Sequence, residues 1–85
     1  MSRSELPAGL AEVVGAHAGV DHAEVTPQMS FADDLGIDSM TMVEVVVAVE
    51  DRFGILILDD DWTRFGTVGD LGDYVVARTA GLARG

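Results

Sequence analysis

Ser39 is the side chain with the clearest chemical potential, because it follows Asp38 where an acidic loop gives way to a long valine-rich segment. A catalytic serine needs a base to accept its proton and an oxyanion hole to stabilise the tetrahedral intermediate. The chain has no GxSxG turn, and neither of its two histidines, His17 and His22, lies near Ser39 in the sequence. These features argue against a hydrolase. Ser39 is then either an ordinary first residue of a helix or the substrate of another enzyme.

No group of side chains in the sequence forms a recognisable metal site. The chain has no cysteine, hence no thiolate ligand, and His17 and His22 do not have the spacing of a metal-binding pair. Three consecutive aspartates at 59–61 lack the alternating spacing and the following glutamate of a calcium-binding loop. We therefore expect no dedicated metal site.

Size and composition indicate a single folded domain over residues 1–85. Hydrophobic residues make up 48% of the chain, which is enough to form a core. No run reaches the roughly 18 apolar residues that a membrane-spanning helix needs. The N-terminal stretch MSRSELPAGL lacks the basic-then-apolar order of a signal peptide, so we expect a cytoplasmic protein.

The charge of the chain is strongly one-sided. Fifteen acidic residues face five arginines and no lysine, for a net charge of −10. Residues 33–61 hold nine of the acidic residues, opposed only by Arg52. This balance argues against nucleic-acid and membrane binding, and it favours protein partners with basic docking surfaces. The simpler interpretation is a solvated face that keeps the protein in solution.

Hydrophobic periodicity predicts helices and no pair of strands. Pro7 fits only in the first turn of the first helix, with Ser4 as a candidate cap, and Gly19 ends that helix. Apolar residues spread through 19–37 favour an ordered loop over a flexible linker. The fold is therefore expected to be all-α, a four-helix bundle with a short third helix, and the expected helices cover residues 4–18, 38–53, 59–65 and 67–80.

The segment 38–53 is rich in valine, which favours strands, yet three features favour a helix. The segment is long for a strand, Asp38 is a good N-cap, and Gly54 is a natural C-terminal stop. At about 100° per residue, one face collects the apolar residues Met42, Val45, Val46, Val49 and Phe53. The opposite face mixes carboxylates with further apolar residues and has Ser39 at its end, which favours a docking surface.

The stretch DLGIDSM resembles the phosphopantetheine attachment motif of acyl carrier proteins, and the likeness continues through VEVVVAVEDRFGI, the DDD turn and TVGDL. It covers residues 25–76 well and the first helix more loosely. The resemblance implies a four-helix bundle that is not itself an enzyme. It also implies that Ser39 carries 4′-phosphopantetheine, which a magnesium-dependent phosphopantetheinyl transferase takes from coenzyme A, and that acyl chains are held on this arm as thioesters.

The resemblance further implies partners and two sets of site residues. The partners are the transferase and basic-patched synthase enzymes: a ketosynthase, a malonyl or acyl transferase and a ketoreductase, each meeting a monomeric carrier. The partner-recognition face is Asp38, Met40, Val43, Glu44, Val47, Glu50 and Asp51. The acyl pocket is Phe31, Met42, Val46, Val49, Ile57, Trp62, Phe65, Leu71 and Tyr74.

Three residues depart from the usual pattern of this family. Met40 replaces the leucine that usually follows the serine, a change that conserves volume. Leu58 stands where a proline commonly begins the third helix. Trp62 occupies a position that is usually small. It either points inward and occupies the acyl cavity, or it lies on the surface.

The pathway is the least determined part of the prediction. The whole pattern is most similar to the fatty-acid carriers of actinobacteria, so fatty acid biosynthesis is the expected pathway. Discrete carriers of polyketide and other secondary-metabolite pathways share the architecture and stay an alternative. An alternative of another class is an unmodified acidic adaptor that uses the same face without a covalent group.

Overall fold

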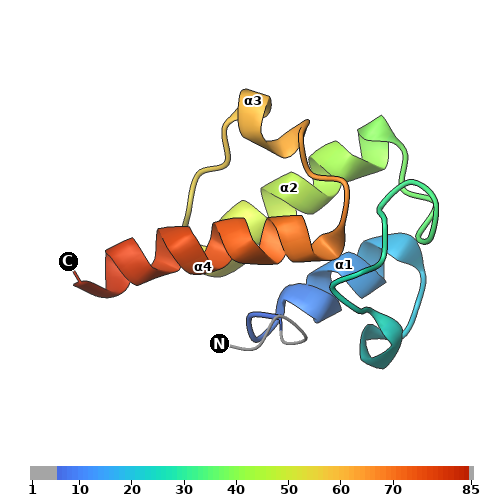
Figure 1. Ribbon diagram of the computed structural model, residues 1–85, viewed down its shortest axis with the longest axis horizontal. Coiled ribbons are helices and arrows are strands. Elements are labelled where there is room, and N and C mark those ends of the chain that lie inside the picture. The colour runs from blue at the N-terminus through green and yellow to red at the C-terminus, as the bar shows by residue number, and fades with distance from the viewer. Residues whose placement is uncertain (1–5, 85) are drawn as a thin grey trace.

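The computed structural model describes the backbone of residues 6–84 and the side chains of residues 6–80. Within this range the chain is helical, without a strand, and contains a single isolated bridge between Ser30 and Thr67. The all-α prediction is confirmed, with three longer helices and a short third one (Figure 1). The elements are α1 (Leu10–Ala18), the 3₁₀ turn η1 (His22–Glu24), α2 (Ser39–Phe53), α3 (Asp59–Trp62) and α4 (Val68–Arg84).

Helix α1 begins later than the sequence predicted. It starts at Leu10 instead of residue 4, because Gly9 has a left-handed backbone with a φ of 92° that cannot continue a helix toward Pro7. The carbonyl of Pro7 instead accepts a turn hydrogen bond from the Leu10 N–H at 3.1 Å. Ser4, the candidate cap, lies outside the described residues. The predicted end at Gly19 is confirmed, since its N–H donates to the Gly15 carbonyl.

The boundaries of α3 and α4 also differ from the predictions. Helix α3 ends at Trp62 instead of residue 65, because the chain then tightens into i→i+3 hydrogen bonds, including Phe65 N–H to Trp62 O at 3.2 Å. Helix α4 begins at Val68 and continues past residue 80 to Arg84. A single glycine at 81 costs a helix only about 1 kcal/mol, and leucine, alanine and arginine follow it.

Helix α2 begins at Ser39, one residue later than predicted, with Asp38 as its N-cap, and it has the end and the buried face that its sequence predicted. Asp38 caps its start, where Oδ1 accepts a hydrogen bond from the Thr41 N–H at 2.8 Å. Gly54 ends it with a φ of 68°. The buried residues are Met42, Val45, Val46 and Val49, and Phe53 is half-buried.

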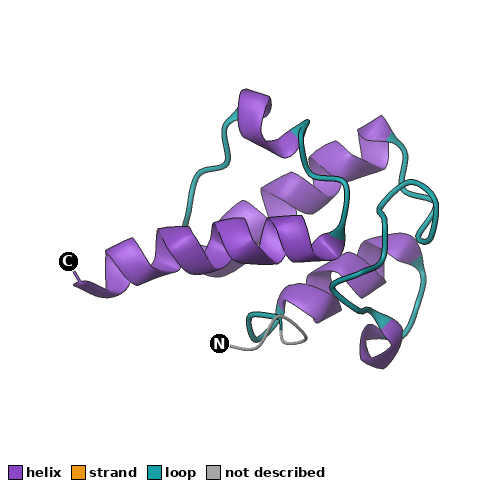
Figure 2. Cartoon of the chain, viewed as in Figure 1, coloured by secondary structure: helices purple, strands orange, loops and turns teal. Residues whose placement is uncertain are grey.

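The long connection between α1 and α2 is an ordered loop, as predicted. Four of its side chains are buried in the core: Val25, Phe31, Leu35 and Ile37. Its backbone is tied to the start of α4, where the N–H groups of Val68 and Gly69 donate to carbonyls of Met29 and Pro27 at 3.0 and 2.9 Å. Figure 2 shows this loop running from α1 past the start of α4 to α2. The loop therefore fixes the backbone that leads into Ser39.

The segment between α2 and α3 is extended and alternates between the core and the solvent. Ile55 and Ile57 are buried, whereas Leu56 and Leu58 are 75% and 59% exposed. Alternating burial of successive side chains is typical of an extended backbone. In the described part of the chain it is a linker to α3, which lies on the opposite side of α4 from α1 (Figure 1). No described helix is long and apolar enough to cross a lipid bilayer.

Candidate functional site

Ser39 is the first residue of α2 and its side chain is exposed. The loop bonded to α4 leads into it, and Asp38 caps the helix that follows. In the described part of the chain its hydroxyl makes no hydrogen bond, so it is available to an incoming molecule. A phosphate group attached there would lie at the positive end of the α2 dipole, where helices stabilise anions.

Asp38 serves the helix and is not a base for Ser39. The hydrogen bond from the Thr41 backbone N–H is the chief cause that lowers the pKa of this carboxyl from the ordinary value of an aspartate. A carboxylate with a lowered pKa is a poor proton acceptor at neutral pH. The histidines have other contacts: His17 Nδ1 lies 2.9 Å from the Val13 carbonyl, and His22 Nδ1 lies 3.6 Å from Asp21. The geometry therefore offers Ser39 no catalytic base from these groups.

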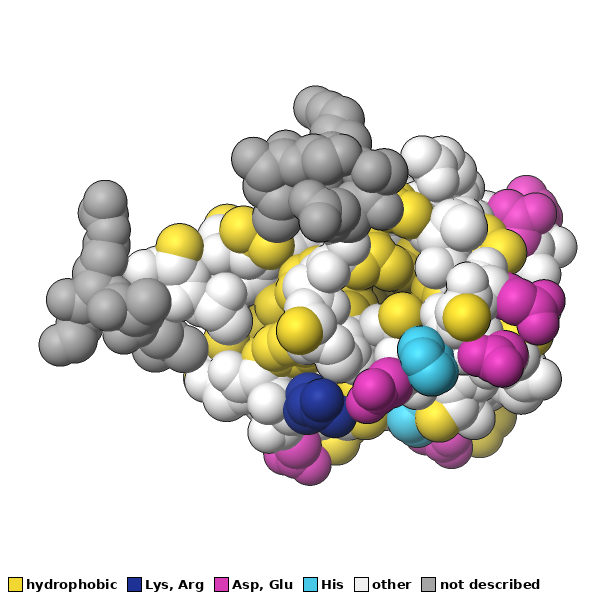
Figure 3. Space-filling model, turned by 90° about the horizontal axis from the view of Figure 1, so that it is seen from below, with side chains coloured by type: hydrophobic (Ala, Val, Ile, Leu, Met, Phe, Trp, Pro, Cys, Tyr) yellow, Lys and Arg dark blue, Asp and Glu magenta, His cyan; other side chains and the backbone are white. Residues whose placement is uncertain are grey.

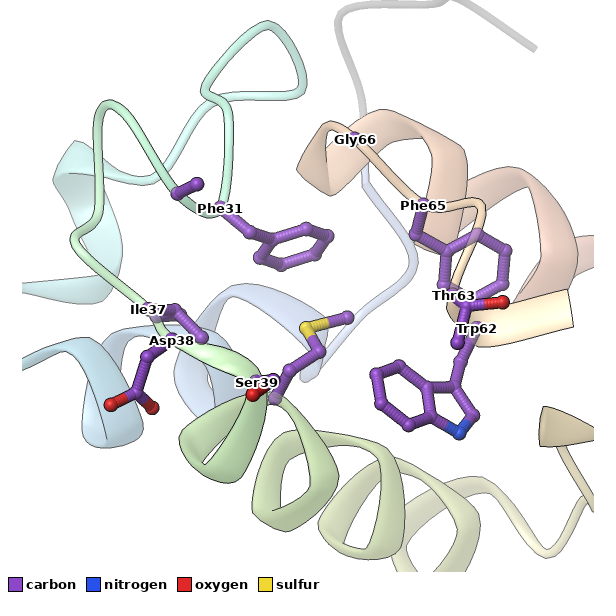
Figure 4. Close-up of a pocket in the computed structure, with 10 residues that line it drawn as sticks. Phe31, Ile37, Asp38, Ser39, Trp62, Thr63, Phe65 and Gly66 are labelled. Carbon is purple, nitrogen blue, oxygen red and sulfur yellow. The ribbon is translucent and has the colours of Figure 1, made fainter. Parts of the chain in front are cut away.

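A hollow of about 190 Å³ opens directly beside Ser39 (Figure 4). Phe31 enters it from the loop before α2, and Trp62 and Phe65 enter it from the α3 side. Its wall is mostly apolar, with Ser39 at the rim. The lining residues are Phe31, Ala32, Ile37, Asp38, Ser39, Met42, Trp62, Thr63, Phe65 and Gly66.

The structure brings only part of the predicted acyl pocket to this hollow. Phe31, Met42, Trp62 and Phe65 line it. Four other residues of the predicted pocket do not line the hollow and are buried in the core: Val46, Val49, Ile57 and Leu71. Tyr74 is half-buried on α4 and contacts Phe65 with its ring.

Four of the lining residues were not predicted from the sequence: Ala32, Ile37, Thr63 and Gly66. Each is adjacent in sequence to a residue that was singled out, so adjacency was the available signal. Which of two neighbouring side chains faces the hollow depends on loop conformation, which periodicity does not give.

Trp62 lies at the hollow instead of flat on the surface away from it. Its side chain is half-buried, and its indole Nε1–H donates to Asp59 Oδ1 at 3.2 Å. This hydrogen bond within α3 directs the polar edge of the ring toward the carboxylate. The rest of the ring is therefore left to form part of the apolar wall (Figure 4).

The outer face of α2 combines apolar and acidic side chains as predicted. Met40, Val43 and Val47 are 78%, 46% and 49% exposed, and Glu44 and Asp51 are exposed beside them. Acidic side chains extend beyond this helix. Figure 3 shows that they also outnumber basic ones on the face that carries α1, gathering at the end where the loop lies.

Glu50 differs from the other predicted recognition residues, because its carboxylate has a partner inside the fold. Its Oε2 accepts a hydrogen bond from the backbone N–H of Ile57 at 2.8 Å, and the residue is only partly exposed. The contact joins the last turn of α2 to the extended linker and places Ile57 in the core. Sequence reasoning missed this role, since the two residues belong to different elements.

The helical domain thus presents an exposed serine at the start of α2, beside an apolar hollow. Residues 8–75 of the chain match the phosphopantetheine attachment site family. Because the match covers most of the sequence, the chain belongs to that family, and its relatives make it an acyl carrier protein.

Three relatives illustrate this. The chain is 47% identical over 79 residues to an acyl carrier protein of Acidothermus cellulolyticus, covering 93% of this chain and 94% of that protein. It is 50% identical over 74 residues to an acyl carrier protein of Thermobifida fusca, covering 87% and 94%. It is 47% identical over 74 residues to a meromycolate extension acyl carrier protein of Mycolicibacterium aurum, covering 87% and 76%.

A solved structure supports the same assignment. The acyl carrier protein from Enterococcus faecalis superposes with a TM-score of 0.72 at 36% identity, covering 92% of this chain and 99% of that one. The protein is thus a non-catalytic carrier whose prosthetic group is 4′-phosphopantetheine, added by a phosphopantetheinyl transferase. An exposed hydroxyl at a helix start, next to an apolar hollow, fits an arm with an anionic end and an acyl end.

Proposed function

We propose that this protein carries acyl intermediates of fatty acid biosynthesis as thioesters on a 4′-phosphopantetheine arm attached to Ser39. The observation that carries the proposal is the position of Ser39: its hydroxyl is exposed at the start of α2 and on the rim of the hollow. Asp38 holds that start in a helical turn through the Thr41 N–H. The phosphate would gain from the helix dipole.

The outer face of α2 is the proposed recognition surface for partner enzymes. Exposed Met40, Val43 and Val47 offer apolar contact, and Glu44 and Asp51 beside them offer negative charge. Complementary basic patches on the transferase and on a ketosynthase, malonyl or acyl transferase and ketoreductase would steer the encounter. Asp38 and Glu50 belong to this surface by position, although both carboxylates also accept backbone hydrogen bonds.

The hollow is the proposed entrance of the acyl pocket. Phe31, Met42, Trp62 and Phe65 supply its apolar wall. Short chains would occupy this space directly. Longer ones would reach Val46, Val49, Ile57, Leu71 and Tyr74 only if side chains now in contact separate, because four of these five residues are buried.

The fatty-acid pathway and a cytoplasmic location are the finer parts of the proposal. Support for the pathway comes from the sequence pattern and from similarity to acyl carrier proteins of Acidothermus cellulolyticus and Thermobifida fusca. The name of the Mycolicibacterium aurum relative refers instead to meromycolate extension. The location rests on two of the expected partners, the phosphopantetheinyl transferase and the malonyl or acyl transferase, which draw on coenzyme A or its thioesters.

Reconstitution tests the pathway. The pantetheinylated protein is incubated with malonyl-CoA, an acyl-CoA starter, reduced nicotinamide cofactors and the malonyl transferase, ketosynthases, ketoreductase, dehydratase and enoyl reductase of an actinobacterial fatty-acid system, and intact mass is followed over time. We expect fully reduced chains that lengthen by two carbons per cycle. The parallel incubation uses a ketosynthase of an aromatic polyketide pathway. Unreduced chain growth in that incubation, with none in the first, would assign the protein to secondary metabolism instead.

A further inference from the structure

Helix α3 is weakly anchored by its own residues. It has four residues, too few for a helix to be stable alone, and none of them is buried. Its N-cap, Leu58, provides no side-chain hydrogen bond. Yet α3 contributes Trp62 to the hollow, and Thr63 and Phe65 follow directly. Apart from Trp62, which packs partly buried against the core, α3 therefore depends on contacts from other elements to hold it and this wall of the hollow in place.

Helix α4 supplies polar contacts of this kind. The Tyr74 hydroxyl donates to Asp61 Oδ2 at 2.9 Å, and an Arg78 guanidinium nitrogen donates to the same hydroxyl at 2.7 Å. The guanidinium also lies 3.9 Å from Asp61 Oδ2. We call Asp61, Tyr74 and Arg78 the α3 latch. Its central hydroxyl donates to a carboxylate and accepts from a cation, an arrangement that strengthens both hydrogen bonds.

Tyr74 also connects the latch to the hollow. Its ring packs edge-on against Phe65, with 5.5 Å between ring centroids and 65° between ring planes. Arg78 covers the ring at 4.8 Å from its centroid. Because Phe65 lines the hollow, one side chain of α4 contacts both α3 and the wall of the hollow.

We propose that the α3 latch sets the length of the acyl chain that the protein shelters, an inference that rests on the proposed carrier function. While the latch is closed, Trp62 and Phe65 keep their positions and the hollow keeps its volume of about 190 Å³. A longer chain needs α3 to move away from α4, which breaks the latch. Weakening the latch should therefore allow the protein to shelter longer acyl chains.

Two variants weaken the latch without emptying the core. Tyr74→Phe removes only the hydroxyl, and Arg78→Gln removes the cation from an exposed residue. The matched control is Thr79→Val, which removes a hydroxyl of α4 that bonds only to carbonyls of its own helix, at 2.8 Å for Val75. Hydrogen exchange at the amides of residues 61–65 in the unmodified protein reports opening of α3. We expect exchange about 2- to 10-fold faster in both latch variants, the effect of one net hydrogen bond, and unchanged in the control.

The second measurement uses the loaded protein. Butanoyl, octanoyl and dodecanoyl forms are treated with hydroxylamine, and the cleavage rate of each thioester is measured. General destabilisation would expose all chains alike, so the ratio of dodecanoyl to butanoyl cleavage is the readout. We expect both latch variants to lower this ratio, and Thr79→Val to leave it unchanged.

The two measurements separate the ways in which the inference could be wrong. Unchanged exchange at residues 61–65 would mean that these contacts do not hold α3. Faster exchange with an unchanged cleavage ratio would mean that the latch holds α3 but does not select chain length. The exchange measurement needs no phosphopantetheine, so failure to load Ser39 would count against the carrier function and not against the latch itself.

Discussion

At the scale of single residues, the site separates two roles that adjacent side chains perform. Ser39 presents an exposed hydroxyl, and Asp38 holds the first turn of α2 through the Thr41 N–H at 2.8 Å. The carboxylate is thus used for structure, and the hydroxyl is left for modification. This division explains why an aspartate next to a serine does not make a catalytic pair here.

Asp38 gives a prediction about pH. Because the pKa of Asp38 is lower in the folded protein than in the unfolded chain, the capping carboxylate contributes its full stabilisation above the unfolded pKa, and this contribution is lost as pH falls through the lower folded pKa. Asp38→Ala should lower the melting temperature at pH 7, and the gap to wild type should narrow below about pH 4. Thermal melts of both proteins from pH 7 to pH 2 measure the gap. A gap that widens on acidification would show that the capping bond does not depend on ionisation.

At the scale of elements, the ends of helices are held by contacts that cross between segments. Glu50 binds the linker after α2 through the Ile57 N–H, and the start of α4 binds the loop before α2. Tyr74 on α4 binds Asp61 on α3. The Tyr74 contact reaches the hollow through Phe65, and the loop bonded to α4 carries Phe31 into it, so the shape of the hollow depends on several elements at once.

Glu50 and Glu44 should therefore behave differently although both lie on α2. Glu50→Ala leaves the Ile57 N–H without its acceptor and should cost about 1–2 kcal/mol of unfolding free energy. Glu44→Ala removes an exposed side chain and should change it by less than about 0.5 kcal/mol. Urea denaturation measures both, and Glu50→Gln, which keeps an acceptor oxygen, should recover part of the loss. Equal losses of unfolding free energy in the two alanine variants would show that Glu50 has no structural role.

The proposed recognition surface on α2 leads to a prediction about the rate of association with partner enzymes. Glu44→Lys should slow association with the phosphopantetheinyl transferase and reduce its dependence on salt, because charges at the rim of an interface act mainly on encounter. Glu24→Lys changes the net charge equally, at an exposed residue of η1 away from α2. Stopped-flow or surface binding kinetics compare the two. If both variants slowed association alike, total charge and not this face would control docking.

At the scale of the whole molecule, negative charge is the dominant feature. The net charge is −10, and the ion pairs of the described residues involve exposed or half-buried groups, such as Arg52 with Glu12 at 3.7 Å. Exposed ion pairs of this kind contribute little to the free energy of unfolding. The folded state must therefore tolerate repulsion, and the small core and the polar contacts offset it.

Salt should consequently stabilise the protein. Raising NaCl from ~0.01 to ~0.15 M shortens the Debye length from about 30 to about 8 Å and screens the repulsion, so the melting temperature should rise. Magnesium at equal ionic strength should raise it at least as much. A double variant, Glu44→Gln with Asp51→Asn, should respond less. A melting temperature that ignores salt would mean that the carboxylates lie too far apart to interact.

Local sequence signals predicted the helix boundaries correctly where only a few neighbouring residues determine them. Asp38 and Gly54 bounded α2 correctly because capping and left-handed stops depend on a few neighbouring residues. The start of α1 was wrong because the left-handed Gly9 could not be distinguished from a helical glycine by spacing. The Glu50–Ile57 and Asp61–Tyr74 contacts could not be predicted, since they join residues 7 and 13 positions apart in different elements. The attachment serine was recognisable, whereas the shape of the hollow was not.

Intact mass spectrometry shows whether Ser39 alone receives the phosphopantetheine arm. Wild type, Ser39→Ala and Ser30→Ala are incubated with coenzyme A, magnesium and a phosphopantetheinyl transferase, and circular dichroism confirms that each is folded. We expect one added arm on wild type and on Ser30→Ala, and no added mass on Ser39→Ala. Modification of folded Ser39→Ala, or a wild type that gains no mass while a known carrier is modified in the same mixture, would contradict this expectation.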